Sequence, residues 1–164
     1  MSLWQDHNWV PHTQLLLNSF AQAVGVDLIE RSGSVEDEAQ RLFNAPIVVV
    51  SHDTQNDPIL NYGNGTALDL WQISVSELLR TPSRLTAEPM HREERTRLLE
   101  RTKRNGFVDD YRGIRITTTG QRFLIEQATV WNLIDESGNP AGQAATFSRW
   151  TCLEPRIPQT SIGS

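Results

Sequence analysis

The first third of the chain has the hydrophobic periodicity of helices. Apolar side chains recur at intervals of three or four between residues 10 and 24, and Gly25 then offers a helix stop. A second helix is predicted from Ser34, because Asp37 stands three residues later and completes a capping box. Neither segment carries a recognisable chemical motif. We therefore interpret residues 1–44 as a helical extension that packs on the domain or on a dimer partner.

The middle of the chain mixes short strands and helices. A β-branched run at 47–50 and an apolar stretch at 59–62 predict two strands on either side of a turn-rich segment. A short helix is predicted to begin at Asn64, and a further helical turn is predicted over 74–79, with Ser74 or Ser76 near its N-cap. The segment 89–104 predicts a longer helix with charged sides and a narrow apolar stripe, so we expect it at the surface.

The last third predicts an antiparallel meander. Three strand-like runs cover 107–117, 122–133 and 142–150, with turn residues between them. The tail at 155–164 is rich in proline and small polar residues, so we expect it to be disordered. Strict alternation along the middle run would place the following side chains on one face: Phe123, Ile125, Gln127, Thr129, Trp131 and Leu133.

The composition narrows the function classes. The 164 residues are enough for one domain with a sizeable core, and the formal net charge of −5 argues against direct nucleic-acid binding. Cys152 is the only cysteine, so neither an intramolecular disulfide nor a cysteine-based zinc cluster can form. No run has the length of a bilayer-spanning helix or the pattern of a leader, so we predict no membrane association and a cytoplasmic location.

Two strands, several short helices and three strands follow one another in the order of a PAS domain. The stretch ILNYGNGTALDLW and the SVSELL after it resemble the segment that joins the second strand of PAS domains to their small helices. A closer resemblance is to the MEKHLA family, a PAS-like domain found alone in bacteria and at the C-terminus of some plant homeodomain-zipper transcription factors. The motifs that carry it are VVVSHDTQNDPILNYGN, TPSRLTAEPMHREER, DDYRGIRITTTGQRF and IEQATVWNLID, and they span roughly residues 44 to 150.

This resemblance implies an α+β fold for residues 45–154, a PAS-like five-stranded antiparallel sheet with helices over one face. In PAS domains, the space between sheet and helices holds a cofactor or small ligand or is filled by side chains. The chain contains no homeodomain or zipper sequence, so DNA binding is not implied.

Departures from better-known PAS branches limit the cofactors that the resemblance implies. Flavin photoreceptors of the LOV (light-oxygen-voltage) type place a reactive cysteine where this chain has Ser83, so a cysteinyl-flavin adduct is excluded there, whereas flavin without an adduct or another small ligand stays open. Haem is disfavoured, because a lone His91 near a helix start is more often a cap or surface residue. The two histidines His52 and His91 and the carboxylates near them, Asp57 and Glu88, match no metal-ligand spacing, so we predict no metal site.

Candidate ligand contacts follow from the expected position of the PAS pocket. Aromatic side chains and a buried amide would line it, and Arg84 together with Arg112, Arg115 or Arg122 would bind a carboxylate or phosphate. The alternative for the arginines is cross-strand ion pairing on the exposed face. The pocket candidates are Trp71, Arg84, His91, Tyr111, Arg112, Gln127 and Trp131.

Three functions remain open from the sequence. The leading hypothesis is a non-catalytic, PAS-like sensory or regulatory domain that binds a small molecule or a regulatory protein, as a homodimer through its N-terminal helices. The second is a small isomerase- or dehydratase-like enzyme with a cone-shaped cavity, in which Asp110 or Glu126 acts as a buried base beside Tyr111. The third is a protein-interaction domain whose pocket is filled by its own side chains.

Overall fold

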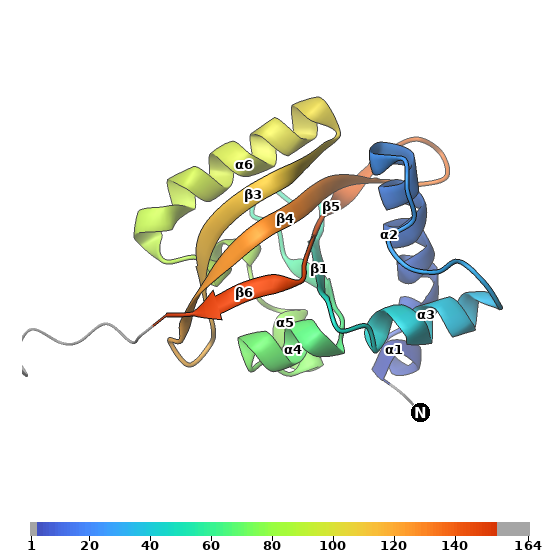
Figure 1. Cartoon of the computed structure of the whole chain (residues 1–164), viewed down its shortest axis with the longest axis horizontal. Helices are drawn as coiled ribbons and strands as arrows, with labels where there is room; N and C mark the ends of the chain where they lie inside the picture. The colour runs from blue at the N-terminus through green and yellow to red at the C-terminus, as the bar shows by residue number, and fades with distance from the viewer. Residues whose placement is uncertain (1–2, 154–164) are drawn as a thin grey trace, which may run out of the picture.

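The computed structural model describes residues 3–153, which form an antiparallel sheet with helices on both faces (Figure 1). The strand order is β2-β1-β5-β4-β3, and β6 also pairs with β4. Strand β5 pairs with residues 129–134 of β4, and β6 pairs with residues 123–126 of the same strand. Strands β5 and β6 therefore act as one interrupted strand, and the predicted five-stranded antiparallel sheet is confirmed. The strands are β1 (Val48–His52), β2 (Leu60–Gly63), β3 (Phe107–Ile116), β4 (Arg122–Ile134), β5 (Pro140–Phe147) and β6 (Arg149–Cys152).

Five short or medium helices cover the inner face of this sheet. They are α4 (Gly65–Trp71), α5 (Val75–Leu78), the 3-10 turns η1 (Ser83–Thr86) and η2 (Pro89–His91), and α6 (Arg92–Asn105). The side chain of Asn64 caps α4 at the predicted helix start, and Ser74, one of the two predicted candidates, caps α5. Helix α6 ends where Gly106 takes a φ of 91°. Within residues 3–153, no helix is both long and apolar enough to cross a bilayer.

Three N-terminal helices lie on the outer side of the sheet: α1 (Leu3–Asp6), α2 (Trp9–Val24) and α3 (Val35–Phe43). Of these, α2 packs on β4, whereas α1 and α3 pack on α2. Leu16 and Leu17 of α2 are almost fully buried in a cluster that also contains strand residues. Phe20 packs edge-on against Trp131 of β4, with 4.9 Å between ring centroids. The apolar side of α2 therefore contacts the sheet of its own chain (Figure 1).

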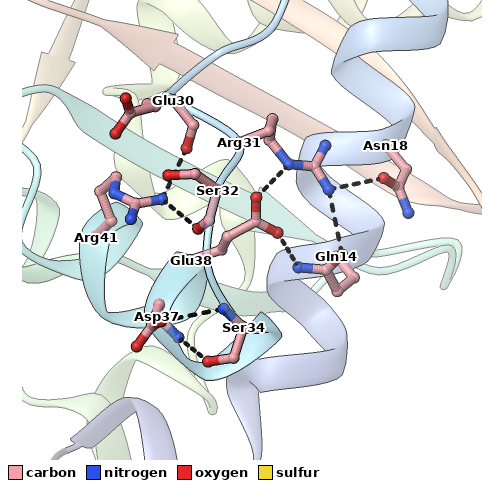
Figure 2. Close-up of polar contacts among 9 residues, drawn as sticks. All are labelled: Gln14, Asn18, Glu30, Arg31, Ser32, Ser34, Asp37, Glu38 and Arg41. Carbon is pink, nitrogen blue, oxygen red and sulfur yellow. Dashed lines mark hydrogen bonds and ion pairs between the residues drawn. The ribbon is translucent and has the colours of Figure 1, made fainter.

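A polar cluster fixes the loop between α2 and α3 (Figure 2). The Glu38 carboxylate is 8 % exposed and accepts hydrogen bonds from Arg31 Nε at 2.8 Å and Gln14 Nε2 at 2.9 Å. The hydrogen bond and charge of Arg31 hold the pKa of Glu38 below its ordinary value. At the start of α3, Ser34 and Asp37 form the predicted capping box.

The alternation predicted along β4 is wrong beyond Ile125, because the strand contains a bulge. Gln127 has a φ of 51°, and the pairing with β3 shifts register in this region. Ile125 and Ala128, three residues apart instead of two, therefore both face the inner helices. A one-residue shift moves all later side chains to the opposite face, so Trp131 packs under α2.

Candidate functional site

A cavity of about 80 Å³ lies between the inner face of the sheet and the helices η1 and α6. Most of its wall is apolar and comes from β3, β4, β5, α4 and α6. The aliphatic and aromatic residues that contribute include Trp71, Leu98, Ile125, Val130 and Phe147. The polar residues that line it include His52, Ser83, Arg95 and Arg115, so charged and apolar chemistry meet in one space.

Asn64 sets the position of α4 and hence of the Trp71 wall. Its fully buried amide accepts hydrogen bonds from the backbone N–H groups of Val49 and Ala67, and donates to the carbonyls of Leu42 and Ile47. One side chain thus joins β1, the end of α3 and the first turn of α4. Such a fully satisfied buried amide leaves the helix little freedom to move.

Trp71 closes one side of the cavity at the end of α4. Its ring packs edge-on against Phe123 and Phe147, at centroid distances of 5.2 and 6.2 Å. Its indole N–H is buried and has no hydrogen-bond partner among residues 3–153. Buried donors are nearly always paired, so this atom indicates a partner outside the described chain, such as a water or a ligand.

His52 places a second unpaired polar atom in the cavity wall. Its Nδ1 lies 2.9 Å from the backbone oxygen of Asp53, so Nδ1 carries the proton and Nε2 is the acceptor. Burial lowers the pKa of His52, which keeps the imidazole neutral at pH 7. Nε2 is buried and, in the part of the chain that the structure describes, receives no hydrogen bond.

Arg95 brings a buried positive charge to the cavity from α6. It is 8 % exposed, and its guanidinium donates a hydrogen bond to the Ser83 hydroxyl. Burial, with the nearby charge of Arg115, lowers the pKa of Arg95 to about 10, so the group stays charged at neutral pH. No carboxylate of residues 3–153 forms an ion pair with it.

Arg115 brings a second buried charge, from β3. It is 7 % exposed, its guanidinium carbon lies 5.2 Å from the ring centroid of Tyr111, and its Nη1 donates to the Ile114 carbonyl. The Tyr111 hydroxyl donates to Glu94 at 3.1 Å, and burial is the main cause of its raised pKa. A side chain at Gly113 would collide with this hydroxyl, so the glycine allows the tyrosine ring to lie along the strand.

A larger cleft of about 350 Å³ adjoins the cavity. The two share Trp71, Val50, Leu60 and Thr86 as walls. The cleft adds mainly apolar and small polar side chains from α5, η1 and the β3–β4 turn: Ile73, Leu78, Thr81, Leu85, Ile116, Thr117 and Thr118. Trp71 therefore stands between a small charged chamber and a larger apolar one.

The structure brings two of the predicted pocket residues, Trp71 and Tyr111, to the cavity wall. Arg84 lies outside it, exposed, with its Nε 3.1 Å from Asp57 Oδ1. Arg112 is likewise exposed and lies 3.8 Å from Glu126. For Arg112 the cross-strand ion pair considered as the alternative is what the structure shows.

The other three predicted residues also lie away from the cavity lining. His91 stands at the junction of η2 and α6, where it precedes the first residue of the helix. Gln127 occupies the exposed bulge of β4, where Arg149 donates to its side-chain oxygen. Trp131 is buried under α2 on the outer face, and the bulge at Gln127 is the reason for both errors.

Sequence reasoning missed Arg95 and His52 as cavity residues. The buried residues of α6 are Arg95, Leu98 and Thr102, which follow the spacing of one helix face. An arginine inside the apolar stripe of a charged helix is the signal that could have identified the first. His52 ends β1 with inward alternation from Val48 and Val50, which could have identified the second.

A family model described as the MEKHLA domain matches residues 10–152. This chain belongs to the MEKHLA family. The match begins inside α2, so the part of the chain that resembles the family includes α2 and α3 as well as the sheet. No curated protein matches this MEKHLA domain in sequence.

Solved structures with this fold are PAS and LOV domains. The PAS domain of a protein from Colwellia psychrerythraea is 16% identical, with a TM-score of 0.59 over 73% of this chain and 96% of that one. A LOV domain studied with a flavin analogue is 18% identical, with a TM-score of 0.53 over 72% and 85%. The light-state dimer of the fungal photoreceptor Vivid is 15% identical, with a TM-score of 0.54 over 80% and 90%. The predicted PAS-like fold of the MEKHLA domain is confirmed.

A flavin does not fit the cavity of this MEKHLA domain. Sites for molecules of that size have volumes of roughly 300–1,000 Å³, whereas the cavity has about 80 Å³. Ser83, where the resemblance to flavin photoreceptors would place a reactive thiol, instead accepts a hydrogen bond from Arg95.

Proposed function

We propose that this MEKHLA domain is a sensory or regulatory module that binds a small molecule between the inner face of its sheet and α6. The observation that carries the proposal is a pair of buried atoms of cavity-lining residues, Trp71 Nε1 and His52 Nε2, that have no hydrogen-bond partner among residues 3–153. Leaving a buried polar atom unpaired costs about 1–3 kcal/mol. A polar group of a ligand, or an ordered water held beside the ligand, would pair with each atom.

The site has less of the chemistry that the enzyme hypothesis requires. A carboxylate base of raised pKa has to be buried. Asp110 is 77% exposed and lies 3.1 Å from Arg101, and Glu126 is 43% exposed and pairs with Arg112. Neither carboxylate therefore supplies the buried base that was considered, and a binding role agrees better with the geometry.

A homodimer through the N-terminal helices is part of the proposal, by analogy with the dimeric Vivid structure. The apolar side of α2 already contacts the sheet, so a second copy would meet the outer sides of the three N-terminal helices. Leu3 and Val35, each 44% exposed, are apolar residues available there. Replacing both with serine should lower the fraction of dimer measured by light scattering. A wild-type protein that is monomeric in the same assay would refute the dimer.

The binding proposal is tested by a matched pair of tryptophan variants. Trp71 and Trp131 both have a buried indole N–H without a partner among the described residues, but they lie on opposite faces of the sheet. Binding of small-molecule fragments is measured by NMR, and any ligand retained on purification is detected by native mass spectrometry. We expect Trp71→Phe to weaken binding and Trp131→Phe to leave it unchanged. The proposal would be overturned if the purified protein retained no ligand and no fragment shifted the Trp71 indole signal.

A further inference from the structure

We propose that the ligand of this cavity is an amphipathic carboxylate, with its acid group between Arg95 and Arg115 and its apolar part extending past Trp71 into the adjoining cleft. The inference rests on the proposed function, because it names the chemical class that the cavity binds. It goes further in assigning the charge of the ligand, the two residues that recognise it and the direction in which it lies.

The first argument is the pattern of ion pairs. Arg95 and Arg115 are the buried arginines among residues 3–153, with exposures of 8% and 7%. The arginines that do pair with carboxylates, from Arg31 to Arg122, have side chains that are 22% exposed or more. The two arginines with least access to water thus have no carboxylate partner among residues 3–153, the reverse of what desolvation alone favours.

The contacts of the two groups only partly replace the lost hydration. Arg95 has the Ser83 hydroxyl, and Arg115 has the Tyr111 ring and one backbone carbonyl. Asp57 offsets the positive field at Arg95, but it is 53% exposed and is bound by Arg84. Each guanidinium has five N–H donors, so several donors of each side chain stay available to an anion. A carboxylate bound by both would relieve their mutual repulsion and satisfy donors in the fork geometry that arginine prefers.

The volumes of the cavity and the adjoining cleft indicate the size and shape of the apolar part of the ligand. The chamber that contains the two arginines has a volume of about 80 Å³, which suits an acid group and little more. The cleft beyond Trp71 has about 350 Å³ and is lined by apolar residues such as Ile73 and Ile116. Because the two spaces share Trp71 and three other wall residues, an aliphatic chain attached to the acid group would extend past the indole ring into the cleft. A linear monocarboxylate therefore matches both chambers.

The test compares hexanoate with its neutral analogue hexanamide, with the full chain at pH 7. Binding is measured by calorimetry and by the indole N–H signal of Trp71. We expect hexanoate to bind about tenfold or more tightly than hexanamide, because a guanidinium–carboxylate contact is a charge-assisted hydrogen bond. Arg95→Gln and Arg115→Gln should each abolish that preference. Arg112→Gln, an exposed arginine on the same strand as Arg115, should preserve it.

Three outcomes separate this inference from the proposed function. Equal binding of hexanoate and hexanamide, with the Trp71 signal shifting, would overturn the carboxylate assignment and leave a small-molecule site. A preference for hexanoate that survives both Arg95→Gln and Arg115→Gln would place the acid group elsewhere and also overturn it. Binding of neither probe would remove the amphipathic carboxylate and count against the site itself. Circular dichroism shows whether each variant folds. If one arginine variant does not fold, the other is sufficient for the test.

Discussion

Replacing Asn64 with alanine tests whether one buried amide holds the helical layer on the sheet. The side chain is fully buried and makes four hydrogen bonds, two as acceptor and two as donor. Alanine removes all four and leaves their backbone partners in a space that water does not reach. The cap of α4 is lost at the same time, so the variant combines a capping defect with unpaired buried groups.

The expected loss follows from the number of partners left unpaired. The Leu42 carbonyl keeps a hydrogen bond from the Ala45 N–H, so its own loss is small. The Val49 and Ala67 N–H groups and the Ile47 carbonyl lose the Asn64 contact altogether. An N-cap contributes about 1 kcal/mol and each unpaired buried group costs about 1–3 kcal/mol. We expect Asn64→Ala to lower the free energy of unfolding by about 4 kcal/mol.

The assay is urea unfolding at 25 °C, followed by tryptophan fluorescence and far-ultraviolet circular dichroism. Ser74→Ala is the matched control, because Ser74 caps α5 with an exposed hydroxyl that accepts from the Glu77 N–H at 3.2 Å. It should cost about 1 kcal/mol. Equal losses in the two variants would refute the reasoning, since the buried hydrogen bonds of Asn64 would then add nothing to its cap.

Asn64→Asp supplies a pH test of the same site. The two acceptor bonds survive, but a carboxylate would face the Leu42 and Ile47 carbonyls that the amide now donates to. The pKa of that buried acid should lie above its unfolded value, so protonation favours the folded state. The variant should therefore be closest to wild type in stability near pH 4 and lose stability as pH rises. A loss that grows towards low pH would contradict this.

Three further predictions concern the rest of the fold. Glu38→Gln removes a carboxylate whose pKa is lowered in the folded protein, so the stability that it contributes is present above its ordinary pKa of 4.5 and lost as pH falls through the folded value. The difference in unfolding free energy between wild type and this variant should be largest at pH 7 and shrink towards pH 3. Gly142→Ala places a Cβ against the His52 carbonyl at a φ of 128°, so it should lower the free energy of unfolding by about 3 kcal/mol. Gly138→Ala, in an open turn at a φ of 83°, should lower it by about 1 kcal/mol. Leu16→Ala should lower the unfolding free energy by about 2–5 kcal/mol in a single transition, because the side chain is fully buried against the sheet; two transitions would show that α2 unfolds separately.

The sequence by itself determined the features that depend on neighbouring residues. The capping box of Ser34 and Asp37, the cap at Asn64 and the helix stop at Gly106 are local hydrogen-bond and backbone preferences. Such preferences act within a few residues, so they can be read without the fold. The order of elements and the family motifs extended these local predictions to a PAS-like sheet and to MEKHLA membership, both confirmed.

Only the tertiary structure decided which side chains meet. The bulge at Gln127 leaves no pattern in the residues themselves, yet it moved Trp131 from the predicted pocket to the outer face. Whether an arginine binds a surface carboxylate or enters the cavity depends on distant partners. Arg84 binds the surface carboxylate of Asp57, 27 residues away, whereas Arg95 is buried and donates to the Ser83 hydroxyl. Burial and pairing of charges arise from the packing of remote segments, so the candidate site emerged only once the chain was folded.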